Sequence, residues 1–199
     1  MSNFWDERYG DKEYVYGTNP NHFLKVQLHK FPKGKILFPC DGEGRNSVYA
    51  AKIGWQTESF DQSIEGMKKA QLLAKQNNVD ISYQVADALE IEFIPDTFDA
   101  VALLYTHFPK EIRSIIHKKI ISWLKPGGVI ILEAFNPLQL NNTSGGPKDI
   151  NMLYSKEIIL KDFNEFKNEL LTEETIILDE GNYHQGKADV VRYVGIKIQ

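Results

Sequence analysis

The sequence of 199 residues predicts an α/β fold, with a doubly wound, mostly parallel seven-stranded sheet that ends in an antiparallel C-terminal hairpin. From residue 35 onward, short β-type runs alternate with runs of helical periodicity, which is typical of parallel strands joined by crossover helices. Near the C-terminus, two strand-like runs follow each other without a helical segment between them, which predicts antiparallel pairing at the sheet edge. The length fits one domain, 1–199, with an N-terminal lid or helix segment over 1–34 and a core over 35–199.

The strands and helices are expected in strict order along the chain. The expected strands are 35–39, 56–60, 81–85, 98–104, 129–134, 175–178 and 189–198, and the last two are joined by 180–187. The expected helices are 45–53, 63–77, 109–124 and a short one capped by Ser155. Asn19 as cap and Pro20 in the first turn predict a further helix that reaches about residue 30. The segment 136–148, rich in Asn, Gly and Pro, is a loop long enough to suggest a functional role.

Composition narrows the classes of protein and of partner. Apolar residues make up 42% and charged residues 25%, values typical of a soluble globular protein, and no apolar run approaches the roughly 20 residues of a membrane span. Cys40 is the only cysteine and the N-terminal residues lack signal-peptide features, so we expect a cytoplasmic location. The net charge of −4, without a dense Lys/Arg run, disfavours a nucleic-acid partner. No metal is expected, since the histidines lack metal-type spacing, and the oligomeric state is left open.

Three polar positions follow three successive strands. A turn with Gly42 and Gly44 comes between the first strand and its helix, where glycines let a ligand approach the backbone and the helix N-terminus favours anionic groups. Asp61 ends the second strand, 61 − 42 = 19 residues after Gly42, which is the spacing of an acidic residue that binds ribose hydroxyls. Asp87 follows the third strand. Because the carboxyl ends of parallel strands line one crevice, we expect these residues around a single nucleotide-like ligand.

The same geometry also suits a nicotinamide cofactor. A pyrophosphate fingerprint has glycine or alanine at the sixth position, counted from Gly42, and here that position is Ser47. This difference favours another adenosyl ligand. An NAD(P)-dependent oxidoreductase and a non-catalytic adenosine-ligand binding protein remain the alternatives at this point.

The layout, which includes Leu124-Lys-Pro-Gly-Gly128 before the fifth strand, resembles the Rossmann-like class I S-adenosylmethionine-dependent methyltransferases over nearly the whole chain. Gly42-Glu-Gly-Arg-Asn-Ser47, together with Tyr183-His184 and the later Val191-Arg-Tyr-Val194, resembles the tellurite-resistance methyltransferases. The opening, with Trp5-x-x-x-Tyr9 and Phe38-Pro39, is similar to the thiopurine methyltransferases.

The resemblance implies S-adenosyl-L-methionine as cofactor and transfer of its methyl group to a small-molecule nucleophile, for which a thiol or a chalcogen oxyanion is our expectation. It implies that Gly42 and Gly44 approach the methionine portion, that Asp61 holds the ribose, and that Asp87 with Ala88 holds the adenine. Further cofactor contacts are expected from Cys40, Gln62 and Tyr105. The acidic residue and first glycine of the usual motif fall at Phe38 and Cys40, which leaves Asp41 or a backbone carbonyl to hold the methionine amino group.

Two histidines are candidates for the general base. His107 follows the fourth strand and His184 lies in the predicted hairpin loop, and an imidazole with an ordinary pKa near ~6.5 suits removal of a proton from a hydroxyl, amine or thiol. A helix-cap or loop histidine explains His107 equally well, and the alternative for His184 is an ordinary turn followed by a partly exposed strand arginine, Arg192. The substrate-binding candidates are Trp5 and Tyr16 from an aromatic N-terminal lid, and Tyr183 and Arg192, which would bind an anionic substrate beside His184.

Overall fold

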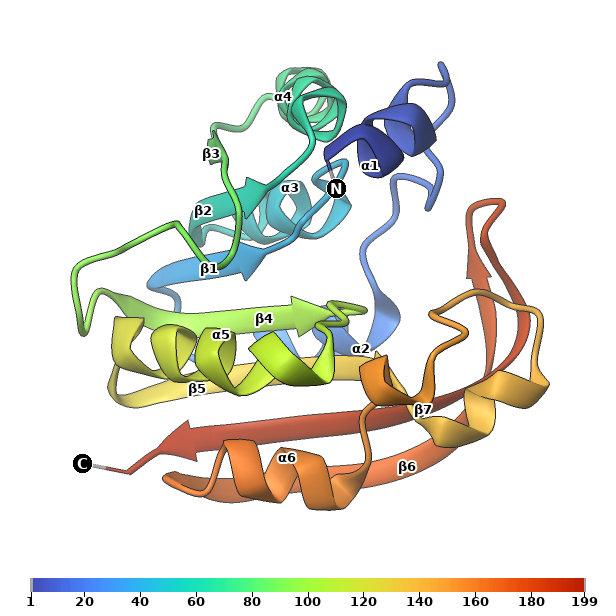
Figure 1. The fold of residues 1–199 in the computed structure, drawn as a ribbon. Coiled ribbons are helices and arrows are strands. Elements are labelled where there is room, and N and C mark those ends of the chain that lie inside the picture. Colours follow the sequence, from blue (N-terminus) through green and yellow to red (C-terminus); the bar gives the residue numbers. More distant parts are fainter. Residues whose placement is uncertain (1, 199) are drawn as a thin grey trace.

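A seven-stranded sheet forms the centre of the structure, a computed structural model that describes residues 2–198. Its strands are β1 (Lys35–Pro39), β2 (Gln56–Asp61), β3 (Ser82–Val85), β4 (Phe98–Leu104), β5 (Leu124–Phe135), β6 (Phe166–Glu180) and β7 (His184–Lys197). They lie in the order β3-β2-β1-β4-β5-β7-β6 (Figure 1). The first five strands are parallel, and β7 runs antiparallel between β5 and β6. The predicted α/β class and C-terminal hairpin are therefore confirmed.

Helices cover both faces of this sheet. They are α1 (Ser2–Tyr9), α2 (His22–Leu28), α3 (Arg45–Lys52), α4 (Ile64–Gln76), α5 (Lys110–Trp123) and α6 (Lys156–Asp162), with 3₁₀ turns η1 (Pro137–Asn141) and η2 (Ile150–Met152). On one face, Leu24 of α2 and Ala50 of α3 pack in a cluster with Phe38 of β1. On the other, Ile116 of α5 and Ile159 of α6 pack in a second cluster, and α5 and α6 lie along the sheet in Figure 1. Within residues 2–198 no helix has the length and apolar character needed to cross a membrane.

The N-terminal segment is anchored to the core beside the first strand ends. Asp6 of α1 accepts a hydrogen bond from the Ser63 hydroxyl at 2.6 Å, and Ser63 in turn caps α4. The Val15 amide donates to Glu43, in the turn after β1, at 2.8 Å. These contacts hold α1 next to α4 (Figure 1). The Tyr9 ring at the end of α1 lies against Gly42 in that turn.

The start of the N-terminal helix was wrongly expected at Asn19 and Pro20. The cap is Asn21, whose side-chain oxygen accepts from the Leu24 amide at 2.9 Å, and α2 ends at Leu28. The amide group of Asn21 also donates to Glu133 at 2.5 Å, 112 residues further along the chain. A long-range partner thus helps to select the cap, which local sequence patterns do not reveal.

The extents of β5, β6 and β7 also differ from the expectation. The strand β5 begins at Leu124, which pairs with Phe98 before a register shift, so the Pro-Gly-Gly segment lies within the strand. β6 begins at 166 and β7 at 184, which leaves only residues 181–183 for the connection. The first half of β6 is mostly polar and exposed, so it lacks the apolar alternation by which a strand is recognised in sequence.

Candidate active site

A cavity of about 450 Å³ lies at the carboxyl ends of the parallel strands, bordered by α1 and by the start of β7. It brings together most of the residues singled out from the sequence. Those in its lining are Trp5, Tyr16, Cys40, Gly42, Asp61, Gln62, Asp87, Ala88, Tyr105, His107 and His184. Gly146 and Pro147, from the loop expected to have a functional role, also line it, whereas Gly44, Tyr183 and Arg192 do not. We call this cavity the cleft.

The turn after β1 is connected directly to the end of β2. The Gly42 amide donates to Asp61 Oδ2 at 3.1 Å, and the Ser63 amide donates to Asp61 Oδ1 at 2.9 Å. Asp61 is 5% exposed, and burial raises its pKa to about 6. Gly42 has φ +59°, and a side chain there would collide with the Tyr9 hydroxyl. The turn therefore presents a bare backbone beside a buried carboxylate, which suits a ligand with hydroxyl groups.

Two residues of the cleft adopt the left-handed conformation that normally favours glycine. Cys40 has φ +53° and Tyr105 has φ +54°. Cys40 occupies the place of a glycine in the motif that the sequence resembles, so the backbone keeps the glycine conformation although the residue has changed. Such conformations cost on the order of 1–3 kcal/mol and concentrate at functional sites. Burial also raises the pKa of the Cys40 thiol, which keeps the thiol protonated and poorly nucleophilic.

Gly44 was expected near the methionine portion of the cofactor, and its surroundings in the structure give a packing reason for a glycine at this position. It has φ +81°, and a Cβ built on it would lie 2.5 Å from the Cβ of Ala70 on α4. Gly44 also precedes the first residue of α3. Its lack of a side chain therefore permits close packing of the turn against α4, and it does not line the cleft.

Two further carboxylates lie in the wall of the cleft. Asp87 is exposed, and its Oδ1 accepts from the Leu89 amide at 2.8 Å. Asp41 is the more unusual group, because burial raises its pKa to about 7. Its Oδ2 accepts from the Ser59 hydroxyl at 3.2 Å, whereas its Oδ1 has no hydrogen-bond partner among the described residues. A buried acceptor without a donor is an unsatisfied group that a bound cation would complete.

His107 was expected as a candidate base, and in the structure both of its ring nitrogens contact backbone groups. Its Nδ1 lies 2.8 Å from the Met152 carbonyl oxygen, and its Nε2 accepts from the Phe135 amide at 3.3 Å. Both ring nitrogens are thus occupied by the backbone, with Nδ1 as the donor. Burial lowers the pKa of His107 to about 4, so it stays neutral. His107 fixes the backbone around the cleft and has no free nitrogen to accept a proton.

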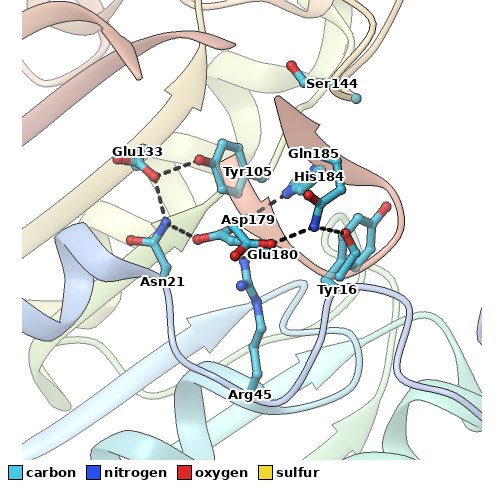
Figure 2. Close-up of polar contacts among 12 residues, drawn as sticks. Tyr16, Asn21, Arg45, Tyr105, Glu133, Ser144, Asp179, Glu180, His184 and Gln185 are labelled. Atoms are coloured by element: carbon cyan, nitrogen blue, oxygen red, sulfur yellow. Dashed lines mark hydrogen bonds and ion pairs between the residues drawn. The ribbon is translucent and has the colours of Figure 1, made fainter. Parts of the chain in front are cut away.

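His184 has the opposite arrangement. It is the first residue of β7, and its ring lies 4.5 Å from that of Tyr16 and 4.7 Å from that of Tyr105, between centroids. Its Nδ1 is 3.4 Å from Glu180 Oε2 (Figure 2), while Nε2 has no hydrogen bond with a described residue. Burial lowers the pKa of His184. A neutral imidazole that donates through Nδ1 keeps Nε2 free as a proton acceptor.

A buried polar network supports this side of the cleft, and of the members described below only Tyr105 was expected from the sequence. Glu180 forms an ion pair with Arg45 of α3 at 2.8 Å. Glu133 is 1% exposed and accepts from the Tyr105 hydroxyl at 2.7 Å and from Asn21 at 2.5 Å, as Figure 2 shows. The available signal was a glutamate inside the apolar β5 run, since a buried acid requires partners.

Arg192 and Tyr183 were expected beside His184 in a substrate site, and neither lines the cleft. Arg192 forms ion pairs with Glu133 at 2.5 Å and with Glu174 at 2.7 Å. It lines a neighbouring cavity of about 540 Å³, so it supports the polar network from outside the cleft. Tyr183 is 50% exposed, and its ring packs against Tyr16 at a centroid distance of 6.4 Å. Trp5, in contrast, lines the cleft and stacks on Tyr9.

Comparison with known proteins points to one family. Residues 36–128 match the family model of a methyltransferase domain. Over 140 residues, the chain is 27% identical to a ubiquinone biosynthesis O-methyltransferase of Xanthomonas campestris pv. campestris, an alignment that covers 68% of this chain. The alignment covers 58% of that relative's length. The residues 36–128 that match the family model contain the Gly42 turn and the ends of β1, β2 and β3 that border the cleft.

Solved structures with low sequence identity share the fold. A structure from work on the conversion of a disulfide bond into a thioacetal group during echinomycin biosynthesis has a TM-score of 0.82 and 15% identity, and covers 100% of this chain and 92% of that one. TehB from Haemophilus influenzae has a TM-score of 0.72 and 15% identity, with 98% and 66% covered. A SAM-dependent methyltransferase from Methanosarcina mazei has a TM-score of 0.72 and 17% identity, with 87% and 97% covered.

Proposed function

We propose a function from the premise that this chain contains a methyltransferase domain and has the class I fold of S-adenosylmethionine-dependent methyltransferases. The proposed activity is transfer of a methyl group from S-adenosylmethionine to a small-molecule nucleophile bound in the cleft. One observation carries the proposal: Gly42, Asp61 and Asp87 line the same cavity as His184. The alternative of a nicotinamide-dependent oxidoreductase has no comparable support, because the family match is to a methyltransferase domain.

The residues of the cleft fit this donor. Asp61 retains lone pairs for ribose hydroxyls beside the bare backbone of Gly42, and Asp87 with Ala88, which line the same cleft, would hold the adenine. The unsatisfied Oδ1 of Asp41 supports it as the partner of the positively charged methionine amino group. When bound, the donor supplies a methyl group on a positively charged sulfur. Aromatic rings such as those of Trp5 and Tyr16 favour a nearby cation by about 0.5–2 kcal/mol.

The protein's own contribution is alignment and proton removal. Holding two reactants in the correct geometry lowers a barrier by roughly 7–11 kcal/mol, so the chain needs no covalent intermediate. His184 would take the proton of the acceptor's S–H or O–H on Nε2, while Glu180 holds its Nδ1–H. The negative charge of Glu180 also stabilises the imidazolium that results.

The acceptor class is a thiol or a chalcogen oxyanion in our proposal. It is supported by the structural likeness to TehB and to the protein studied in thioacetal formation. A hydroxyl acceptor is the second candidate, because the curated relative is an O-methyltransferase. A thiol and a hydroxyl must each lose a proton on methylation, and His184 offers a base of moderate pKa for that step. A chalcogen oxyanion already has a charged lone pair and needs no base, so the site geometry is compatible with each acceptor class.

The test is turnover of methyl-labelled S-adenosylmethionine over a panel of thiophenol, selenite, tellurite and catechol. Label transfer to thiophenol, selenite or tellurite is expected, and transfer to catechol alone would select the hydroxyl candidate. Thermal shift with S-adenosylhomocysteine and with NADH accompanies the panel. Stabilisation by NADH alone would contradict the methyltransferase assignment, and binding of S-adenosylhomocysteine without turnover would favour a non-catalytic binding protein.

A further inference from the structure

Arg8 of α1 lines the cleft and was not singled out by the sequence analysis. Its guanidinium carbon lies 4.8 Å from the ring centroid of Phe4 and 4.4 Å from that of Tyr183. Its Nη1 donates to the Tyr16 hydroxyl at 3.4 Å. Aromatic rings therefore hold the guanidinium in place without neutralising its charge.

The charge of Arg8 sets it apart from the other arginines. Arg45, Arg113 and Arg192 each have a carboxylate within ion-pair distance. Among the residues that the structure describes, Arg8 has none. A guanidinium carries five N–H donors. Within the part of the chain that the structure describes, the Arg8 side chain uses one of them, in the hydrogen bond to the Tyr16 hydroxyl. The wall of the cleft thus holds a positively charged guanidinium with N–H groups that can donate to a ligand.

Among the described residues that line the cleft, no other side chain carries an uncompensated positive charge. Arg45 is neutralised by Glu180, and burial keeps His107 and His184 neutral by lowering their pKa values. A planar guanidinium fork matches a carboxylate or oxyanion through two parallel hydrogen bonds. We propose that Arg8, together with the Tyr16 hydroxyl, binds a carboxylate or oxyanion within the cleft. This inference rests on the proposed methyl transfer. It specifies that either the methyl donor or the acceptor carries the anionic group that Arg8 binds.

The anionic group belongs either to the methyl donor or to the acceptor, because residues around Arg8 contact the expected binding regions of both. Tyr9, the residue after Arg8, lies against Gly42 in the turn assigned to the donor's methionine portion, which carries a carboxylate. Tyr16, bonded to Arg8, packs against His184, where the acceptor must be bound. The anion is thus either the donor's carboxylate or an acidic group of the acceptor.

The first arm of the test concerns the donor. Isothermal titration calorimetry compares S-adenosylhomocysteine with 5′-methylthioadenosine, which lacks the amino-acid portion, on wild-type protein, Arg8→Gln and Arg8→Lys. If the donor's carboxylate is bound, Arg8→Gln weakens S-adenosylhomocysteine roughly 10- to 100-fold and leaves methylthioadenosine unchanged, with Arg8→Lys in between. Lys12→Gln is the matched control, because it removes one positive charge from an exposed site in the same segment.

The second arm concerns the acceptor. Protein saturated with S-adenosylhomocysteine is titrated with benzoate and with selenite, and loss of their binding in Arg8→Gln alone assigns the anion to the acceptor. Arg8→Gln protein that melts like wild type and binds all four probes with wild-type affinity would overturn the proposal. Wild-type protein that binds neither adenosyl compound would instead contradict the proposed methyl transfer. If Arg8→Gln does not fold, the test uses Arg8→Lys alone. Lysine cannot form the two parallel hydrogen bonds of a guanidinium, so wild-type affinity of Arg8→Lys for every probe would reject the proposed anion site.

Discussion

Glu180 and His184 are a cross-strand pair at the ends of β6 and β7, with Glu180 Oε2 3.4 Å from His184 Nδ1. The turn of three residues between these strands fixes their register, and this register places the two side chains opposite each other. The ion pair with Arg45 ties the same carboxylate to α3. His184 is therefore oriented from two elements of the fold.

Replacement of His184 by glutamine is expected to lower kcat by about 10²- to 10⁴-fold, because the proposed proton acceptor is lost. Affinity for S-adenosylhomocysteine, measured by calorimetry, should stay near that of wild type. His29→Gln serves as the control, since His29 is exposed on the surface. Wild-type turnover in the His184 variant would exclude it as the base.

The rate is expected to fall on the acid side with a midpoint below pH 6.5. Burial lowers the pKa of His184, and the base must be neutral to accept a proton, so activity is retained until the pH falls through this lowered value. Glu180→Gln should move the midpoint further down, because the carboxylate raises the pKa of His184. A pH–rate profile of both proteins measures this, and an unchanged midpoint would show that Glu180 does not act on the base.

Gly44→Ala is expected to destabilise the protein by more than Gly127→Ala. Both glycines have positive φ, +81° and +75°, so each alanine suffers a backbone cost of roughly 1–2 kcal/mol. Only at Gly44 does the new methyl group also collide with Ala70, whereas nothing lies within 4 Å of a Cβ at Gly127. Urea unfolding gives the two free energies of unfolding, and equal losses would contradict the packing role of Gly44.

Asp41→Asn is expected to make the ligand-free protein more stable at pH 8. Burial raises the pKa of Asp41 from 3.8 to about 7, so the folded state binds more protons than the unfolded state between these values. Stability therefore decreases as pH rises through this window, and above it the substitution should gain on the order of 1–4 kcal/mol.

Thermal or urea unfolding across pH 4 to 8 checks this prediction. The advantage of Asp41→Asn should shrink toward the acid end, as the pH approaches the unfolded-state pKa of 3.8 and the difference in protonation between the two states disappears. A pH-independent difference would argue against titration of a buried Asp41. Ser59→Ala provides a comparison, because it removes the hydroxyl that donates to Asp41 and should enlarge the cost of the charge.

Local patterns in the sequence were sufficient to predict the α/β class, the five parallel strands and a cleft at the carboxyl ends of these strands. Strand periodicity, the Gly42 turn and the acidic residues after β2 and β3 are local features, and the parallel topology brings strand ends together whatever their exact spacing. The N-cap of α4 at Ser63 and that of α6 at Ser155 were likewise readable, because a cap depends on the next three residues.

Local patterns did not reveal which side chains keep a free hydrogen-bonding atom or an uncompensated charge, because tertiary contacts set both. The sequence offered both His107 and His184 as candidate bases, yet backbone groups from 135 and 152 occupy both nitrogens of His107, whereas Nε2 of His184 has no hydrogen bond with a described residue. Arg192 is neutralised by Glu133 and Glu174, whereas Arg8 keeps its charge. The physical reason is that hydrogen bonding, burial and charge compensation are set by partners distant in the chain, and these partners are brought together only when the sheet has formed.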